Sequence, residues 1–137
     1  MPNAGDSPSP IESLDPDACW NLLETQSLGR LAVAAERVEI FPVNFLVHER
    51  SVYFASAPGS KLMEILHDPH VAFEADGSAS ADLWSVVIHG RAVRLARDSD
   101  IEGSGVLRFK GWHPGEKHNY VRIIPDEITG RRFPRAE

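Results

Sequence analysis

The segment YFASAPGSKL, from Tyr53 to Leu62, changes character halfway along its length. Tyr53 and Phe54 are typical of a β-strand, because aromatic side chains fit the pleated surface of a sheet. After the small residues in the middle, Leu62 begins a run with apolar side chains at helical spacing, which Pro69 closes. The segment therefore predicts a strand that turns sharply into a short helix over Gly59–Asp68.

This turn carries several groups that favour an anion. Backbone N–H groups at the start of a helix are free to donate, and Gly59 would let a ligand approach the backbone closely. The hydroxyls of Ser56 and Ser60 can donate hydrogen bonds, and Lys61 adds a positive charge. Together these groups predict a phosphate site. On the motif alone, a helix that starts at Pro58, with a serine cap and with Lys61 in solvent, explains the same residues.

Strands are expected before this segment. From Arg30 onward, apolar residues recur at close to alternate positions, which is the period of half-buried strands. Three neighbouring strands result, joined by short turns at Ala35–Arg37 and His48–Arg50, and we expect them to form a meander. The apolar positions are Leu31, Val33, Val38, Ile40, Val43, Phe45, Val47, Val52 and Phe54.

A further helix is expected before the first of these strands. Asp15 and Pro16 form the pattern of an N-cap followed by proline at the first helical position. Trp20 and Leu23 supply apolar positions, and Gly29 is expected to end the segment.

The rest of the chain again has the composition of strands. They are expected at His70–Asp76, Leu83–Ala96, Tyr120–Ile124 and Glu127–Phe133, with a mobile connection at Gly77–Ala81 and a break at Pro125. About six strands with only two clear helices indicate a mainly β protein. Turn signals between the strands favour a closed or partly closed antiparallel barrel over a parallel sheet.

Length and composition limit the classes of protein to consider. A chain of 137 residues fits one domain, and we expect residues 1–13, rich in proline, glycine and serine, to be a flexible leader before a single domain at 14–137. The net charge of −6 disfavours a nucleic-acid partner. Cys19 is the single cysteine, and the chain has neither a signal-peptide pattern nor an apolar run of membrane length. A cytoplasmic protein is expected.

Several motifs, in this order and spacing, resemble the FMN-binding split-barrel superfamily that includes pyridoxamine 5′-phosphate oxidase, and above all its small bacterial members. The motifs are Gly29–Ala32, Phe41–Phe45, Ser56–Leu62, Val71–Glu74, Trp84–Ala92 and Gly130–Phe133. The resemblance implies a six-stranded antiparallel split β-barrel with a few short helices. It also implies a homodimer with FMN near the interface. A surplus of apolar strand positions over what a small barrel interior needs is a further indication of a dimer.

The resemblance also implies which residues contact the cofactor. Pro42, Val43 and Asn44 would run past the flavin ring and ribityl chain, and Ser56, Gly59, Ser60 and Lys61 would hold the phosphate. Trp84 and Ser85 would approach the cofactor, often from the second subunit, and Arg131 would approach the flavin or a substrate anion. Simpler roles stay open for three of these residues: Asn44 as a polar residue on an outward face, Trp84 as a core or dimer contact, and Arg131 as a solvated charge.

The implied activity is that of an FMN-dependent oxidoreductase with a small-molecule substrate. The segment Asp98–Gly115, with Phe109 and Trp112, is expected to shape the substrate side of the flavin. Pyridoxamine phosphate oxidases themselves are longer and hold their substrate with a C-terminal arginine and histidine. No histidine follows His118 in this chain, so the resemblance does not extend to vitamin B6 oxidation.

Three alternatives keep the same fold. The cofactor could be a deazaflavin, or a haem with His89 as a poor axial ligand, or the chain could be a non-catalytic flavin-binding or structural dimer. The spacing of the six histidines does not predict a metal cluster. No hydrolase motif is present in the sequence.

Overall fold

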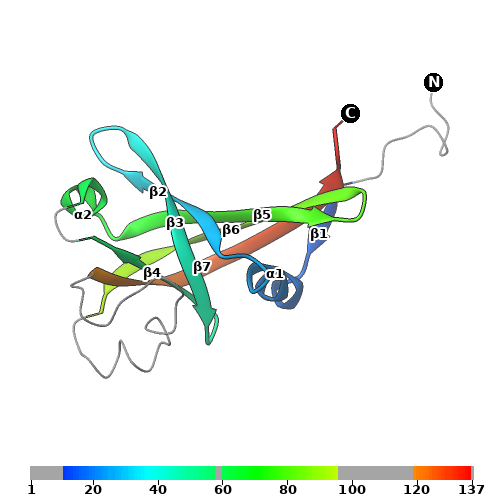
Figure 1. Cartoon of the computed structure of the whole chain (residues 1–137), viewed down its shortest axis with the longest axis horizontal. Helices are drawn as coiled ribbons and strands as arrows, with labels where there is room; N and C mark the ends of the chain where they lie inside the picture. Colours follow the sequence, from blue (N-terminus) through cyan, green and yellow to red (C-terminus); the bar gives the residue numbers. More distant parts are fainter. Residues whose placement is uncertain (1–10, 58–59, 96–118, 137) are drawn as a thin grey trace.

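A computed structural model describes residues 11–57, 60–95 and 119–136 of the chain. Figure 1 shows long, curved strands with two short helices at the periphery. The elements are β1 (Glu12–Leu14), α1 (Pro16–Leu23), β2 (Leu28–Ala34), β3 (Val38–His48), β4 (Ser51–Ser56), α2 (Lys61–Ile65), β5 (His70–Ala79), β6 (Asp82–Arg94) and β7 (Asn119–Pro134).

Within the described residues, seven strands form one antiparallel sheet in the order β1-β7-β4-β3-β2-β5-β6. A further pairing between β6 and β7 closes this sheet into a ring, so the edges of these two strands are paired with each other. The predicted mainly β, antiparallel barrel is confirmed. Beyond the predicted strands, the sheet includes β1, which pairs with Gly130–Arg132 of β7 and includes Glu12 and Ser13, two residues of the expected leader.

The barrel is split between β3 and β4. The two strands pair only from Phe45–Phe54 to His48–Ser51, around the turn that joins them. Before Phe45, β3 pairs with β2, while Ala55 and Ser56 of β4 pair with β7. The two strands therefore lead to different parts of the sheet, and in the described part of the chain the facing edges of Pro42–Asn44 and Ala55–Ser56 are not bonded to each other.

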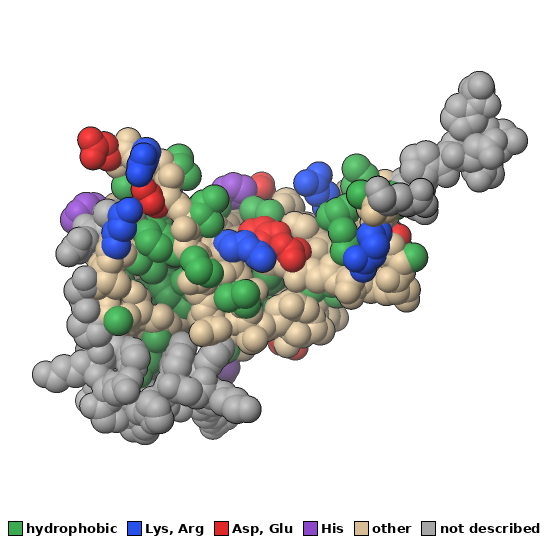
Figure 2. All heavy atoms as spheres, turned by 45° about the horizontal axis from the view of Figure 1, so that its top comes forward, with side chains coloured by type: hydrophobic (Ala, Val, Ile, Leu, Met, Phe, Trp, Pro, Cys, Tyr) green, Lys and Arg blue, Asp and Glu red, His purple; other side chains and the backbone are tan. Residues whose placement is uncertain are grey.

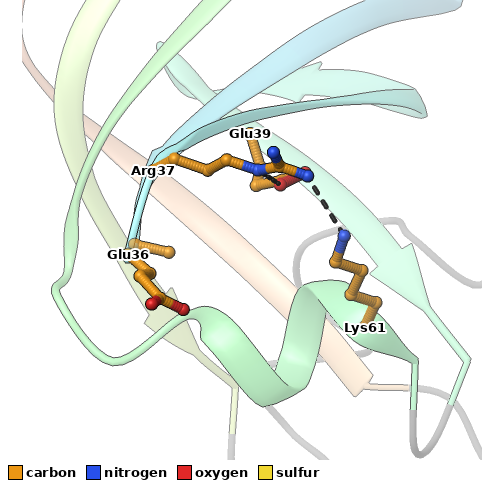
Figure 3. Close-up of a pocket in the computed structure, with 5 residues that line it drawn as sticks. Glu36, Arg37, Glu39 and Lys61 are labelled. Carbon is orange, nitrogen blue, oxygen red and sulfur yellow. Dashed lines mark hydrogen bonds and ion pairs between the residues drawn. The ribbon is translucent and has the colours of Figure 1, made fainter.

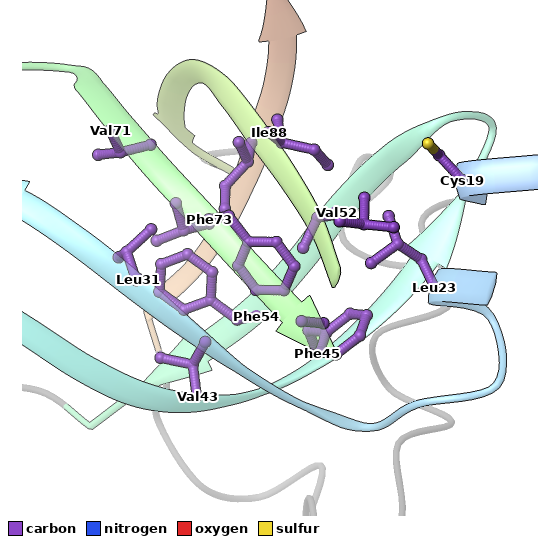
Figure 4. Packing of buried hydrophobic residues seen from close by; sticks show 14 of the residues in the cluster. Cys19, Leu23, Leu31, Val43, Phe45, Val52, Phe54, Val71, Phe73 and Ile88 are labelled. Carbon is purple, nitrogen blue, oxygen red and sulfur yellow. The ribbon is translucent and has the colours of Figure 1, made fainter. Parts of the chain in front are cut away.

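Large side chains fill the interior of the barrel (Figure 4). Phe45 and Phe73 meet edge to face, with ring centroids 4.9 Å apart, and Trp84, Phe54 and Ile88 are also fully buried. Each such side chain stabilises the fold by roughly 1.5–3 kcal/mol relative to leaving it exposed. The helix α1 packs against the same core through Cys19, Trp20 and Leu23.

The start of α1 is as the sequence predicts. Pro16 is its first residue, and the Asp15 carboxylate accepts a hydrogen bond of 2.8 Å from the N–H of Ala18. The expected end at Gly29 is wrong, because the helix ends at Leu23 and Gly29 lies within β2. Gly29 is needed there for packing: a Cβ at this position would lie 2.4 Å from the Phe73 ring.

Two other expectations about breaks in the strands are also wrong. Gly77–Ala79 belongs to β5, so the connection to β6 is only Ser80 and Ala81, and Ser80 has the positive φ of 58° that so tight a turn requires. Pro125 does not end a strand, because β7 continues through it. The register with β6 shifts there: Gly90 faces Pro125 and His89 faces Glu127, which leaves one extra residue in β7.

Candidate functional site

A pocket of about 440 Å³ lies at the split between β3 and β4. It brings together six of the ten residues that the sequence analysis assigned to a cofactor, from two strands and the start of α2. Its lining consists of Phe41, Pro42, Val43, Asn44, Ala55, Ser56, Ala57, Ser60, Lys61 and Leu62. Both edges of the split contribute, so the pocket is a direct consequence of the way β3 and β4 diverge.

The hydroxyl groups of Ser56 and Ser60 meet in the lining of this pocket. Their oxygen atoms are 2.7 Å apart, and the Ser60 hydroxyl also accepts a hydrogen bond of 3.3 Å from the N–H of Met63. Ser60 is therefore the cap of α2, as the simpler interpretation of the motif has it, and it lines the pocket as well. The two interpretations of this serine are compatible.

The residues of β3 provide the long wall of the pocket. Val43 is buried and points toward the core, whereas Pro42 and Asn44 are exposed on the outward face of the strand. Because the edge of β3 that faces the split has no strand partner in the described residues, its backbone groups are free to bond to a ligand. A planar polar ring could lie along this edge and exchange hydrogen bonds with the backbone.

Lys61 lines both this pocket and a second hollow. The second hollow, of about 560 Å³, lies between the β2–β3 hairpin and α2 and is lined by Ala35, Glu36, Arg37, Glu39 and Lys61. We call it the hairpin pocket. Figure 3 shows Arg37 from the hairpin and Lys61 from α2 both reaching toward Glu39.

Glu39 holds both cations at once. Its Oε1 accepts a hydrogen bond of 3.2 Å from Arg37 Nε, and its Oε2 one of 3.4 Å from Lys61 Nζ. The hydrogen bonds from Arg37 and then from Lys61 hold the pKa of the Glu39 carboxyl below its usual value. No role for Glu39 was predicted from the sequence. A signal for it exists in the pattern of β3, where Glu39 replaces an apolar residue in the series that continues inward through Phe41, Val43 and Phe45.

Three of the other predicted cofactor residues lie away from this pocket. Trp84 is only 2% exposed and packs into the core against Gly77, which favours its alternative role as a core residue. Ser85 and Arg131 are direct cross-strand partners on β6 and β7. With His89 and Thr129 they line a separate hollow of about 490 Å³ on the outer face of the barrel. Within one chain, the structure does not bring Ser85 and Arg131 to the split.

Gly59, Phe109 and Trp112 lie outside the described residues, as does the whole segment Asp98–Gly115.

The outer face of β2, β3 and β5 is unusual for a solvated surface. Leu28 and Ile40 are 50% and 67% exposed, and Arg30 Nη1 bonds Glu74 Oε1 at 3.1 Å and Asp76 Oδ2 at 3.0 Å. Burial and then the neighbouring Asp76 raise the pKa of the Glu74 carboxyl. Figure 2 shows exposed hydrophobic side chains alongside charges of both signs on this side of the molecule.

The described ranges, residues 11–57, 60–95 and 119–136, also bear on metal binding and on the membrane. No group of three or more His, Cys, Asp or Glu side chains there could hold a metal ion. None of the helices in that part of the chain is long and apolar enough to cross a membrane.

A closed antiparallel sheet that splits between β3 and β4, with a polar pocket in the split, defines the class of protein: this is a split β-barrel of the flavoprotein superfamily. The family model for pyridoxamine 5′-phosphate oxidase matches residues 15–132. The chain therefore belongs to the pyridoxamine 5′-phosphate oxidase family.

Two solved structures and one curated protein illustrate the similarity. The FAD binding protein from Mycobacterium smegmatis is 34% identical, covers 90% of this chain and 99% of its own, and superposes with a TM-score of 0.81. The protein DIP1874 from Corynebacterium diphtheriae, of unknown function, is 33% identical over 91% of this chain and 99% of its own, with a TM-score of 0.76. Rv3129 from Mycobacterium tuberculosis is 39% identical over 88 residues, which are 64% of this chain and 80% of that protein.

Proposed function

We propose that this protein is a flavin-dependent oxidoreductase that binds the FMN moiety of its cofactor in the pocket at the split and acts on a small molecule. The observation that carries the proposal is the convergence of Ser56, Ser60 and Lys61 with the free edge of β3 around a single pocket. The Mycobacterium smegmatis relative, which binds FAD by name, supports a flavin as the ligand.

The phosphate belongs at the end of the pocket that holds Ser56, Ser60 and Lys61. The two hydroxyls, 2.7 Å apart, can both donate to one anion, because each can rotate its proton away from the other. The Lys61 ammonium adds a charge-assisted hydrogen bond, which is about twice as strong as a neutral one. A cation and two hydroxyls at the end of a pocket fit a phosphate monoester.

The isoalloxazine ring belongs along β3. Val43 gives the wall apolar area, and the unpaired backbone edge of Pro42–Asn44 offers hydrogen bonds to the polar edge of the ring. The Asn44 side chain can both donate and accept. When bound, the flavin supplies the hydride or electron transfer, while these residues orient it and exclude water from one side.

We further propose that the active form is a homodimer. The exposed side chains of Leu28 and Ile40 make the outer face apolar enough to favour a protein partner. In a symmetric dimer, Arg30 could pair with Glu74 of its own subunit, as it does here, or with the same residue of the second copy. A second copy seated on this face would lie beside Pro42 and Asn44, which are exposed on the same side of the sheet. Ser85 and Arg131 of the partner subunit could then complete the cofactor site. The proposed location is the cytoplasm.

The first test is the absorption spectrum of the purified protein after FMN is added and unbound flavin is removed by desalting. We expect flavin bands to be retained by the unmodified protein and by Arg91→Gln, which removes an exposed positive charge on another strand. Lys61→Gln should weaken FMN binding about tenfold, the loss expected when one charge-assisted bond to phosphate is removed.

Two outcomes would count against the proposal. A protein that stays colourless with FMN would turn attention to a deazaflavin, to haem, or to a structural role. Equal retention by Lys61→Gln and the unmodified protein would show that the phosphate lies elsewhere.

A further inference from the structure

The hairpin pocket has no role in the binding of FMN as proposed above, although it adjoins that site. Both hollows include Lys61 in their lining, so a ligand phosphate at Lys61 would lie at the junction between them. Their volumes, about 440 and 560 Å³, are each within the usual range for ligand sites. An FMN molecule would end at this junction and leave the larger hollow to solvent.

The side chains of the hairpin pocket suit a continuation of the ligand beyond its first phosphate. Arg37 and Lys61 bond to different oxygens of the same carboxylate, so an anion that replaced Glu39 between them would contact both cations. An arginine is well suited to this position because its planar guanidinium can bond two phosphate oxygens at once. Ion pairs this exposed contribute little stability, so exchanging Glu39 for a phosphate costs little.

The two carboxylates of the hairpin pocket, Glu36 and Glu39, can accept hydrogen bonds from a ligand. Within the described residues, Glu36 makes no hydrogen bond or ion pair, and Figure 3 shows its side chain leaving the hairpin in a different direction from Arg37. A carboxylate in such a position can accept hydrogen bonds from the hydroxyl groups of a ribose, as acidic residues do in dinucleotide sites. The two cations, Arg37 and Lys61, suit the phosphates of a pyrophosphate, and the carboxylate of Glu36 suits the ribose that follows it.

We propose that the hairpin pocket, formed by Ala35, Glu36, Arg37, Glu39 and Lys61, is a second nucleotide subsite that receives the adenylate half of FAD. The second phosphate lies between Arg37 and Lys61, and Glu36 or the released Glu39 accepts from the ribose. This inference rests on the proposed function, since it requires the FMN moiety to occupy the pocket at the split.

The experiment compares the dissociation constants of FMN and FAD by titration of flavin fluorescence on the apoprotein. We expect FAD to bind at least tenfold more tightly than FMN. Arg37→Gln should weaken FAD about five- to tenfold and leave FMN within twofold, because only the second phosphate contacts this residue. Arg37→Lys should recover part of the loss. Arg91→Gln, with the same change in charge, should alter neither constant.

The outcomes separate this inference from the function on which it rests. If FMN binds and FAD gains nothing over it, or if Arg37→Gln weakens both flavins equally, the adenylate subsite is wrong while the flavin site stands. If neither flavin binds, the proposed function itself fails. AMP tests whether the adenylate group comes from a free nucleotide instead of from FAD. If AMP binds tightly to the FMN-loaded protein while FAD binds no more tightly than FMN, the hairpin pocket belongs to a separate nucleotide and the proposal is overturned.

Discussion

Glu74 is held between a cation and a second carboxylate on the outer face of the barrel. Arg30 bonds both Glu74 and Asp76, yet burial, followed by the proximity of Asp76, raises the pKa of the Glu74 carboxyl above its ordinary value of 4.5. The folded protein thus holds this proton more tightly than the unfolded chain does. The contribution of Glu74 to stability is fully present below pH 4.5 and is lost as the pH rises through the raised pKa.

Replacing Glu74 with glutamine should therefore change how stability depends on pH. We expect the free energy of unfolding of Glu74→Gln, relative to the unmodified protein, to rise as the pH passes from 4.5 through the raised pKa and then to level off. Urea denaturation at fixed protein concentration over a series of pH values measures this difference. A difference that is independent of pH, or that falls as the pH rises, would show that folding does not raise the pKa of the Glu74 carboxyl.

At the scale of the elements, the turn of the hairpin between β3 and β4 consists of two residues that do not favour its backbone conformation. Its two-residue loop places Glu49 and Arg50 at φ values of 49° and 55°, the geometry of a type I′ turn. Such turns usually contain asparagine and glycine, because a Cβ makes positive φ costly. Arg50 also pairs with Asp17 at the start of α1, which ties this hairpin to the helix.

A pair of substitutions at position 50 isolates the cost of the backbone. Arg50→Gly and Arg50→Ala both remove the ion pair with Asp17, but only glycine relieves the positive φ. We expect the glycine variant to be more stable than the alanine variant by about 0.5–1 kcal/mol in urea denaturation. Equal stability of the two variants would mean that the turn does not hold this conformation in solution.

Elements with a clear period could be predicted from the sequence, and elements that depend on distant partners could not. The alternation through β2, β3 and β4 and the cap at Asp15 are local signals, and both predictions are confirmed. Strand β1 has only three residues among polar ones and forms because β7 provides a partner from the other end of the chain. The strand break expected at Pro125 also depends on a distant partner. The neighbouring residues do not reveal that β7 continues through Pro125 with a bulge opposite Gly90 of β6.

The candidate site divides in the same way. Pro42, Val43, Asn44, Ser56, Ser60 and Lys61 come from two segments whose order resembles the family, and they meet in one pocket. Arg37 and Glu39 looked like a turn and a strand residue, because a role for either depends on the distance from the hairpin to α2. Ser85 and Arg131 lie on the outer face, in a hollow apart from the pocket at the split.

At the scale of the whole molecule, the proposed dimer can be tested through Ile40. This side chain is 67% exposed, so Ile40→Glu should leave the barrel folded while it places a charge in the proposed interface. We expect the variant to sediment as a monomer and to retain less FMN, because the partner subunit would no longer complete the site. Val93→Glu, at a residue that is 40% exposed and does not line the hollow around Ile40, is the matched control and should remain dimeric.

An unmodified protein that sediments as a monomer, or an Ile40→Glu variant that stays dimeric, would exclude this face as the interface.

The last strand of the barrel also determines when the protein can fold during synthesis. Because β7 pairs with β1, β4 and β6, a ribosome that has released only the first six strands presents a sheet with the edges of β4 and β6 unpaired. Such edges are templates for association with other chains. The nascent chain thus passes through a period of vulnerability that ends only when residues up to Pro134 have emerged, and chaperones that shield exposed strands would act within that period.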